Sequence, residues 1–185
     1  MKNVKLFLVA SVAFFAASCG NADQKTTTSG MAEPPRDQYI AQIKKLEMEM
    51  HKLPEISNET SILAIKAYSD YAMFFPNDSL APDFLFKAGQ IATAAKKYKQ
   101  ALVFYQTITS KYPNFKYVGE SLYLQGFLLD NFMNDDAGAK LIYEEIITKY
   151  PSTTIARDSK AAIDNLGKTD EQIIEEYKKK NEKTK

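Results

Sequence analysis

The chain has 185 residues, of which 45% are hydrophobic, and its 24 basic residues nearly balance its 23 acidic ones. A nucleic-acid partner would require a concentrated basic face, which this composition does not indicate. The single cysteine excludes an internal disulfide framework. The fold therefore depends on packing, to which 11 tyrosines and 11 phenylalanines contribute.

Residues 1–18 have the organisation of a secretory signal peptide. Lys2 and Lys5 give a short cationic start, and an apolar run over residues 6–17 is followed by small residues before Cys19. This run is shorter than the roughly 20 residues that a membrane-spanning helix needs. We therefore expect residues 1–18 to direct export and then to be removed.

Cys19 is the predicted site of lipid attachment. The segment from Ala16 to Cys19 resembles a lipobox, after which the cysteine is acylated, although Ala16 stands where leucine is usual. Ordinary cleavage after Ser18, at a small-x-small site, is the alternative. A free thiol in an exported protein is exposed to oxidation unless it is covalently modified, and this favours lipidation of Cys19. Gly20 after the cysteine, rather than aspartate, resembles the sorting signal of outer-membrane lipoproteins.

The remaining chain divides into a tether and one helical domain. Residues 19–36 are rich in Gly, Ser, Thr and Pro, which predicts a flexible tether. Residues 37–185 form the predicted domain, and no run in it has the alternation of a half-buried strand. We expect about eight helices, at 37–52, 58–74, 82–96, 98–111, 117–133, 135–149, 153–165 and 170–181. The last helix is predicted to begin with a capping box of Thr169 and Gln172.

Three segments of this domain share one spacing pattern, which indicates an internal repeat. Each contains an aromatic-proline pair, and the prolines Pro76, Pro113 and Pro151 are 37 and 38 residues apart. An alanine stands twelve residues before each proline and a tyrosine eight residues before it. The alanines are Ala64, Ala101 and Ala139, and the tyrosines are Tyr68, Tyr105 and Tyr143. Alanine permits close approach of two helices, the tyrosine is expected to fill the gap against the next helix, and the proline ends the helix.

This pattern resembles the tetratricopeptide repeat. Two repeats carry the family positions in full: Leu85, Ala88, Gly89, Ala92, Ala101, Tyr105 and Pro113, then Leu122, Gln125, Gly126, Leu129, Ala139, Tyr143 and Pro151. The second of these has one extra residue, expected in its internal loop near Asn134. The first repeat matches only in its second half, so residues 37–52 are expected to pack there as an atypical cap. The resemblance implies an all-α solenoid of helical hairpins.

The residues offer little for catalysis or metal binding. His51 is the only histidine, and a closed zinc site would need further Cys or His ligands, so an exposed position at a helix end is expected. Adjacent acidic residues such as Glu144 and Glu145 point about 100° apart on a helix and do not form a facing pair. Asp135 and Asp136 are expected to begin a helix. No catalytic residue, metal or cofactor is predicted, and we expect a binding protein rather than an enzyme.

The resemblance also implies a recognition surface, because the first helix of each tetratricopeptide hairpin lines a groove. The predicted groove residues are Asp83, Phe86 and Gln90 in one repeat and Tyr123, Phe127, Asp130 and Asn131 in the next. Aromatic anchors with an acidic border suit peptide binding. The alternative is that Phe86 and Phe127 are buried between repeats.

These features predict a membrane-anchored periplasmic adaptor that binds other envelope proteins or peptides. The pattern is similar to that of two bacterial families, the repeat lipoproteins of outer-membrane β-barrel assembly and the proteins that work with the Tol–Pal system. Lipid attachment at Cys19 implies a location at the outer membrane, facing the periplasm. The alternative is a lipoprotein that binds a small ligand or an envelope polymer.

Overall fold

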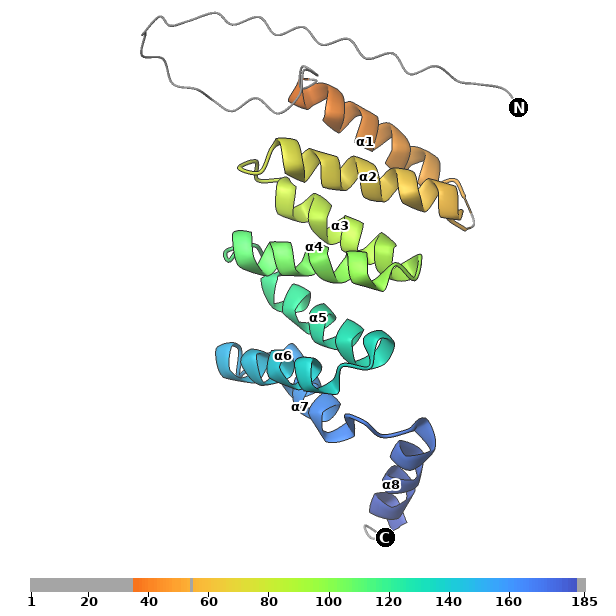
Figure 1. Ribbon diagram of the computed structural model, residues 1–185, viewed down its shortest axis with the longest axis vertical. Helices are drawn as coiled ribbons and strands as arrows, with labels where there is room; N and C mark the ends of the chain where they lie inside the picture. Colours follow the sequence, from red (N-terminus) through yellow and green to blue (C-terminus); the bar gives the residue numbers. More distant parts are fainter. Residues whose placement is uncertain (1–34, 54, 183–185) are drawn as a thin grey trace, which may run out of the picture. The chain divides into compact units, whose positions relative to one another are not determined.

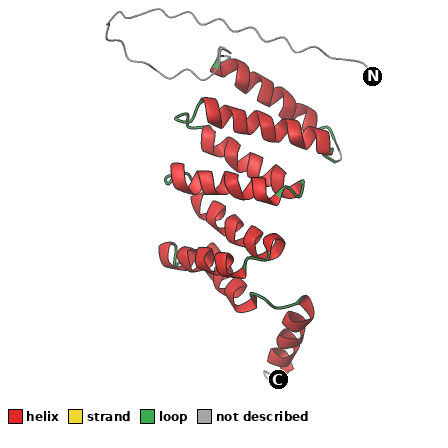
Figure 2. Ribbon diagram, viewed as in Figure 1, coloured by secondary structure: helices red, strands yellow, loops and turns green. Residues whose placement is uncertain are grey.

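The computed structural model describes residues 35–53 and 55–182. The predicted signal peptide, Cys19 and the tether up to residue 34 lie outside these residues. The part of the chain that is described contains eight helices and no strand (Figure 2). None of its helices is long and apolar enough to cross a membrane.

The predicted all-α fold is confirmed, and both ends of every predicted helix lie within two residues of the ends of an observed helix. The helices in chain order (Figure 1) are α1 (Arg36–Met50), α2 (Asn58–Phe74), α3 (Ala81–Ala94), α4 (Tyr98–Lys111), α5 (Val118–Met133), α6 (Asp136–Lys149), α7 (Thr154–Asn165) and α8 (Asp170–Glu182). Since α1 begins at Arg36, the last residue assigned to the tether belongs to the helix. The capping box is also confirmed, because the Thr169 amide donates to Gln172 Oε1 at 2.9 Å and the Gln172 amide donates to Thr169 Oγ1 at 3.4 Å.

Each helix from α1 to α6 packs against the next in chain order, and α5 also contacts α7. The described residues form two cores, one between α1 and α5 and the other between α5 and α7. α1 packs on α2, as expected for the atypical cap, and Ile43 is its one buried residue. The hydroxyl of Tyr68 on α2 donates to Glu47 of α1 at 3.0 Å, and its ring stacks on Phe84 of α3.

The repeat residues lie where neighbouring helices approach each other closely. The three repeat alanines are fully buried, and the three repeat tyrosines are at most 2% exposed. A β-carbon on Gly89 would lie 2.6 Å from Cε1 of Tyr105, and one on Gly126 would lie 2.7 Å from Cε1 of Tyr143. Each of these two rings therefore lies against the preceding helix, not the next helix as expected. The reason is that the glycine leaves room for the ring.

The aromatic-proline turns repeat in three dimensions as well as in sequence. Phe75, Tyr112 and Tyr150 each end a helix, with φ between −122° and −129° and ψ between 48° and 60°. The hydroxyl of Tyr112 donates to the carbonyl oxygen of Pro76 at 2.9 Å, which joins one turn to the turn before it. The same local chemistry therefore sets the chain direction after each hairpin.

The turns inside the two hairpins differ in a way that corrects the sequence analysis. α5 has 16 residues and α3 has 14, and α5 ends at Asn134 in the left-handed conformation (φ 52°). The extra residue therefore belongs to a longer helix, and the turn between α5 and α6 is the shorter one. Asp135 begins α6 as expected, accepting a hydrogen bond from the Gly138 amide at 2.9 Å.

Candidate functional site

The predicted groove residues lie on α3 and α5, the first helices of the hairpins α3–α4 and α5–α6. Spacings of three and four residues place side chains on one face of a helix, so each set shares a face. Gln90 and Asn131 are exposed, and the other five predicted residues are half-buried. The rings on this face are therefore partly packed and partly accessible.

On α3 the predicted residues are engaged with the start of α5. The Phe86 ring stacks on Tyr117 at a centroid distance of 5.1 Å and contacts the rings of Tyr105 and Phe115 at 5.9 and 6.1 Å. Lys116 Nζ lies 3.1 Å from Asp83 Oδ1. Phe86 thus contributes to packing between the hairpins, while only part of its ring is accessible to a partner.

On α5 the predicted residues form a row of aromatic and polar side chains. Tyr123 packs on Tyr143 of α6 at a ring distance of 5.8 Å, and Phe127 packs edge-on against Phe132 at 5.7 Å. The Asn131 side-chain amide donates to the carbonyl oxygen of Phe127 at 3.0 Å, which fixes its orientation along the helix.

Three helices bring negative charge to this row. Burial raises the pKa of Asp130, and the neighbouring charge of Asp136 raises it further, while a hydrogen bond with Tyr143 lowers it. The pKa of Tyr123 is raised first by burial and then by Asp158 on α7 and by Asp130. The pKa of Tyr143 is raised for the same reasons, burial first and then Asp130.

The charge of these carboxylates is largely uncompensated. Within residues 35–53 and 55–182, no basic side chain forms an ion pair with Asp130 or Asp136, and Asp158 contacts only the neighbouring Arg157, at 3.4 Å. Burial is the main cause of these raised pKa values, and a cationic group placed here would relieve the repulsion that adds to it. We call this surface the acidic-aromatic face; it comprises Tyr123, Phe127, Asp130, Asn131 and Asp158, and the buried Tyr143 lies beneath it.

Sequence reasoning missed two residues of this site, the buried Tyr143 beneath the face and Asp158 on it. Tyr143 was assigned only a packing role, yet its hydroxyl reaches Asp130. Asp158 lies on α7, where the repeat pattern stops. The signal that could have found it is Pro151, since α7 follows this proline as α5 follows Pro113.

The chemical groups considered earlier for catalysis lie in ordinary positions. His51 is exposed at the end of α1, as expected. Glu145 pairs with Lys149 at 2.7 Å and Glu144 lies 3.9 Å from Lys140. Such pairs one turn apart are typical of a solvent-facing helix surface. In the described part of the chain, no group of three or more His, Cys, Asp or Glu side chains could hold a metal ion.

Comparison with known families agrees with this geometry. The tetratricopeptide repeat model matches residues 83–114, which comprise nearly all of α3 and α4, and residues 120–153, which comprise most of α5 and α6. No curated protein is significantly similar to the chain. Tetratricopeptide repeats generally mediate protein–protein interaction. The two hairpins with the buried alanine, the glycine and the tyrosine are thus similar to tetratricopeptide repeats, and the described residues form an all-α solenoid of helical hairpins.

Proposed function

We propose that this protein is a lipid-anchored periplasmic adaptor, not an enzyme, and that it holds a protein partner through the acidic-aromatic face in outer-membrane or cell-envelope assembly. The observation that carries the proposal is the convergence of Tyr123, Asp130 and Asp158 from two helices, with no cation on Asp130 among the described residues. Half-buried carboxylates beside aromatic rings suit a lysine or arginine side chain, because the charge pairs with the carboxylate and the aliphatic stem packs on the ring. The partner segment is therefore expected to be basic.

The anchoring part of the proposal rests on the sequence. Residues 1–18 have the pattern of an export signal, and Cys19 is the only cysteine. Several acyl chains, at about 0.8 kcal/mol for each buried CH₂ group, would hold the protein at the membrane. The intact mass of the membrane form should exceed that of residues 19–185 by these acyl chains. An unmodified mass would indicate cleavage after Ser18 by ordinary signal peptidase.

Affinity capture tests the recognition part of the proposal. The full chain is used as bait with solubilised envelopes of the producing bacterium, and a Tyr123→Phe/Asp130→Asn variant is compared with it. These changes keep the ring and the shape of the carboxylate but remove the hydroxyl and the charge. We expect the captured protein to fall about tenfold, because an interfacial charge pair is lost.

The matched control is Tyr177→Phe/Asp164→Asn, which removes the same groups from exposed positions on α8 and α7. Capture by the control should equal that of the unmodified chain. Equal loss in both variants would refute the assignment of the face. Failure of the unmodified chain to retain any protein would favour a binder of a small ligand or an envelope polymer.

A further inference from the structure

Three lysines gather where α3 turns into α4. Lys96 and Lys99 are exposed and Lys97 is half-buried. In the described residues none of the three forms an ion pair, whereas seven other lysines do, among them Lys66 and Lys87. α4 begins here with no side-chain cap, so the positive end of its dipole adds to the lysine charge. The turn is therefore a concentrated positive site in a chain whose charges otherwise nearly balance.

These lysines line a hollow that also has an aromatic wall. The hollow, of about 590 Å³, is bounded by residues 96–100 and by Phe132 and Met133 at the end of α5. The rings of Tyr98 and Phe132 stack at a centroid distance of 4.0 Å and are within 10° of parallel. Phe132 is 42% exposed. An apolar surface thus lies directly beside unpaired positive charge.

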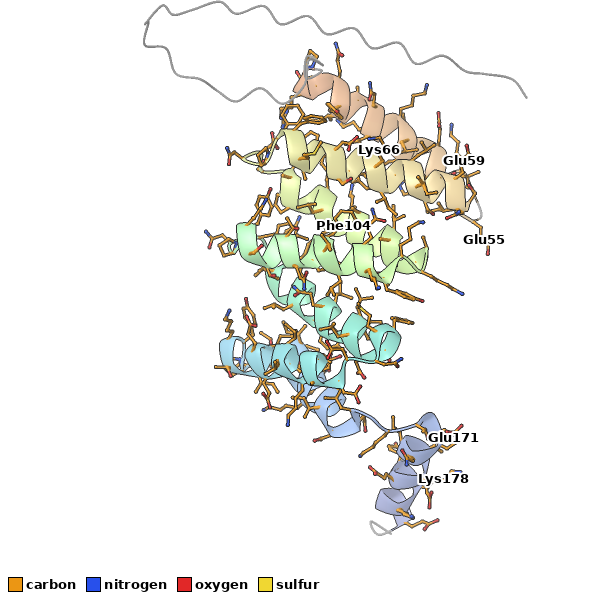
Figure 3. The ribbon with its side chains drawn as sticks, in the orientation of Figure 1. Glu55, Glu59, Lys66, Phe104, Glu171 and Lys178 are labelled. Carbon is orange, nitrogen blue, oxygen red and sulfur yellow. The ribbon has the colours of Figure 1, made fainter. Side chains whose placement is uncertain are left out.

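Two further hollows share residues with the first. One, of about 440 Å³, shares Lys96 and reaches the exposed Ile56 before α2. The other, of about 380 Å³, shares Lys97 and reaches the exposed Ile62 and Lys66, which is labelled on α2 in Figure 3. The two further hollows therefore each border the lysine turn. A single small anion would occupy one of them, whereas an extended chain can occupy all three.

The backbone at Lys96 adds an independent observation. Lys96 has φ 58°, in the left-handed region that favours glycine, and its amide donates to the Thr93 carbonyl at 3.0 Å. The next amide, that of Lys97, donates to Ala92 at 2.8 Å, which completes a common helix-ending motif. Asparagine, which tolerates this conformation, ends α5 in the corresponding turn. A lysine side chain thus stands where backbone conformation alone would favour glycine, which is consistent with a role in recognition.

We propose that this lysine turn binds an extended acidic peptide segment that also carries apolar side chains. Carboxylates of the segment pair with Lys96, Lys97 and Lys99, and its apolar side chains enter the hollows beside Phe132 and the exposed isoleucines. The concave shape favours a peptide over a membrane surface, because hollows accept protruding side chains whereas a bilayer contacts residues that protrude. This surface is opposite in charge to the acidic-aromatic face, and the inference does not depend on that face binding anything.

Fluorescence anisotropy with the full-length chain in detergent tests the proposal. The probe is a labelled peptide in which pairs of glutamates alternate with leucine or phenylalanine, and the matched probe has lysine in place of every glutamate. The acidic peptide should bind and the basic one should not compete with it. A Lys97→Gln/Lys99→Gln variant should weaken binding of the acidic peptide about tenfold and reduce its dependence on salt.

The control variant is Lys44→Gln/Lys45→Gln, which removes the same charge from exposed positions on α1. Its affinity for the acidic peptide should stay within about twofold of that of the unmodified chain. Equal weakening in both variants, or equal binding of the two peptides, would overturn the proposal. Binding to phosphatidylglycerol vesicles by a chain that does not bind the acidic peptide would also overturn it, in favour of a membrane contact.

Discussion

Replacement of Gly89 by alanine tests the contact between Gly89 and Tyr105 inside the hairpin α3–α4. The added β-carbon would lie 2.6 Å from Cε1 and 2.7 Å from Cζ of Tyr105. Carbon atoms pack comfortably at about 3.5–4.0 Å, so the two groups have to separate by roughly 1 Å. Tyr105 is 1% exposed and its ring also contacts Phe86, which leaves it little space to move. The helices α3 and α4 must therefore shift apart.

Two effects of opposite sign decide the magnitude. Overpacking of a well-packed core costs about 1–3 kcal/mol. Alanine is favoured over glycine in a helix by about 0.5–1 kcal/mol, which offsets part of that cost. We therefore expect Gly89→Ala to lower the free energy of unfolding by up to about 2.5 kcal/mol. For a domain of about 150 residues this lowers the melting temperature by up to roughly 10 °C.

Urea and thermal unfolding, followed by the circular dichroism of the helices, measure this change. The control is a double-mutant cycle with Tyr105→Leu, which removes the ring atoms that meet the new β-carbon. Tyr105→Leu alone leaves a cavity, but Gly89→Ala should cost nothing further in its presence, giving a coupling energy of about 1 kcal/mol or more. If Gly89→Ala stabilises the otherwise unmodified chain, helix propensity outweighs the steric contact, and the inference that Gly89 is needed to make room for Tyr105 is wrong.

Three further predictions concern other positions. Ala101→Leu and Ala139→Leu should each lower the free energy of unfolding by about 1–3 kcal/mol in urea titrations, because both alanines are fully buried; unchanged midpoints would show that these crossings are loose. Lys96→Gly should raise the free energy of unfolding by about 1 kcal/mol, since Lys96 has a left-handed φ, whereas Lys99→Gly inside α4 should lower it by a similar amount. Asp130→Asn tests the raised pKa of Asp130. Because the folded chain holds this proton more tightly than the unfolded chain, the protonated carboxyl stabilises the fold at low pH. This contribution is lost as pH rises through the pKa of the folded state. The stability of the Asp130→Asn variant relative to the unmodified chain should therefore rise from below pH 3.8 to pH 7, and a difference independent of pH would contradict the assignment.

The sequence by itself determined the helices and their order. Proline cannot continue a helix, so Pro76, Pro113 and Pro151 mark three helix ends at a fixed period. Capping at Asp135 and Thr169 was also predictable, because a cap depends on residues only three positions apart. These features are local, so their physical cause lies within a few residues of sequence.

Tertiary structure alone decided which side chains meet across helices. The spacing of Tyr105 placed it one turn from Ala101, but its ring lies against Gly89 of the preceding helix. Which ring occupies the space beside a glycine depends on how two helices pack, and the spacing within one helix does not specify this. The packing of Phe86 against Tyr117 is of the same kind.

Both candidate surfaces depend on such distant contacts. Asp158 joins Asp130 and Tyr123 only because α7 packs on α5 and α6. Phe132 stacks on Tyr98 only because the end of α5 lies beside the start of α4. The helical period assigns a residue to a face of its own helix. The packing of the helices then determines which groups lie opposite that face and which charges stay unpaired there.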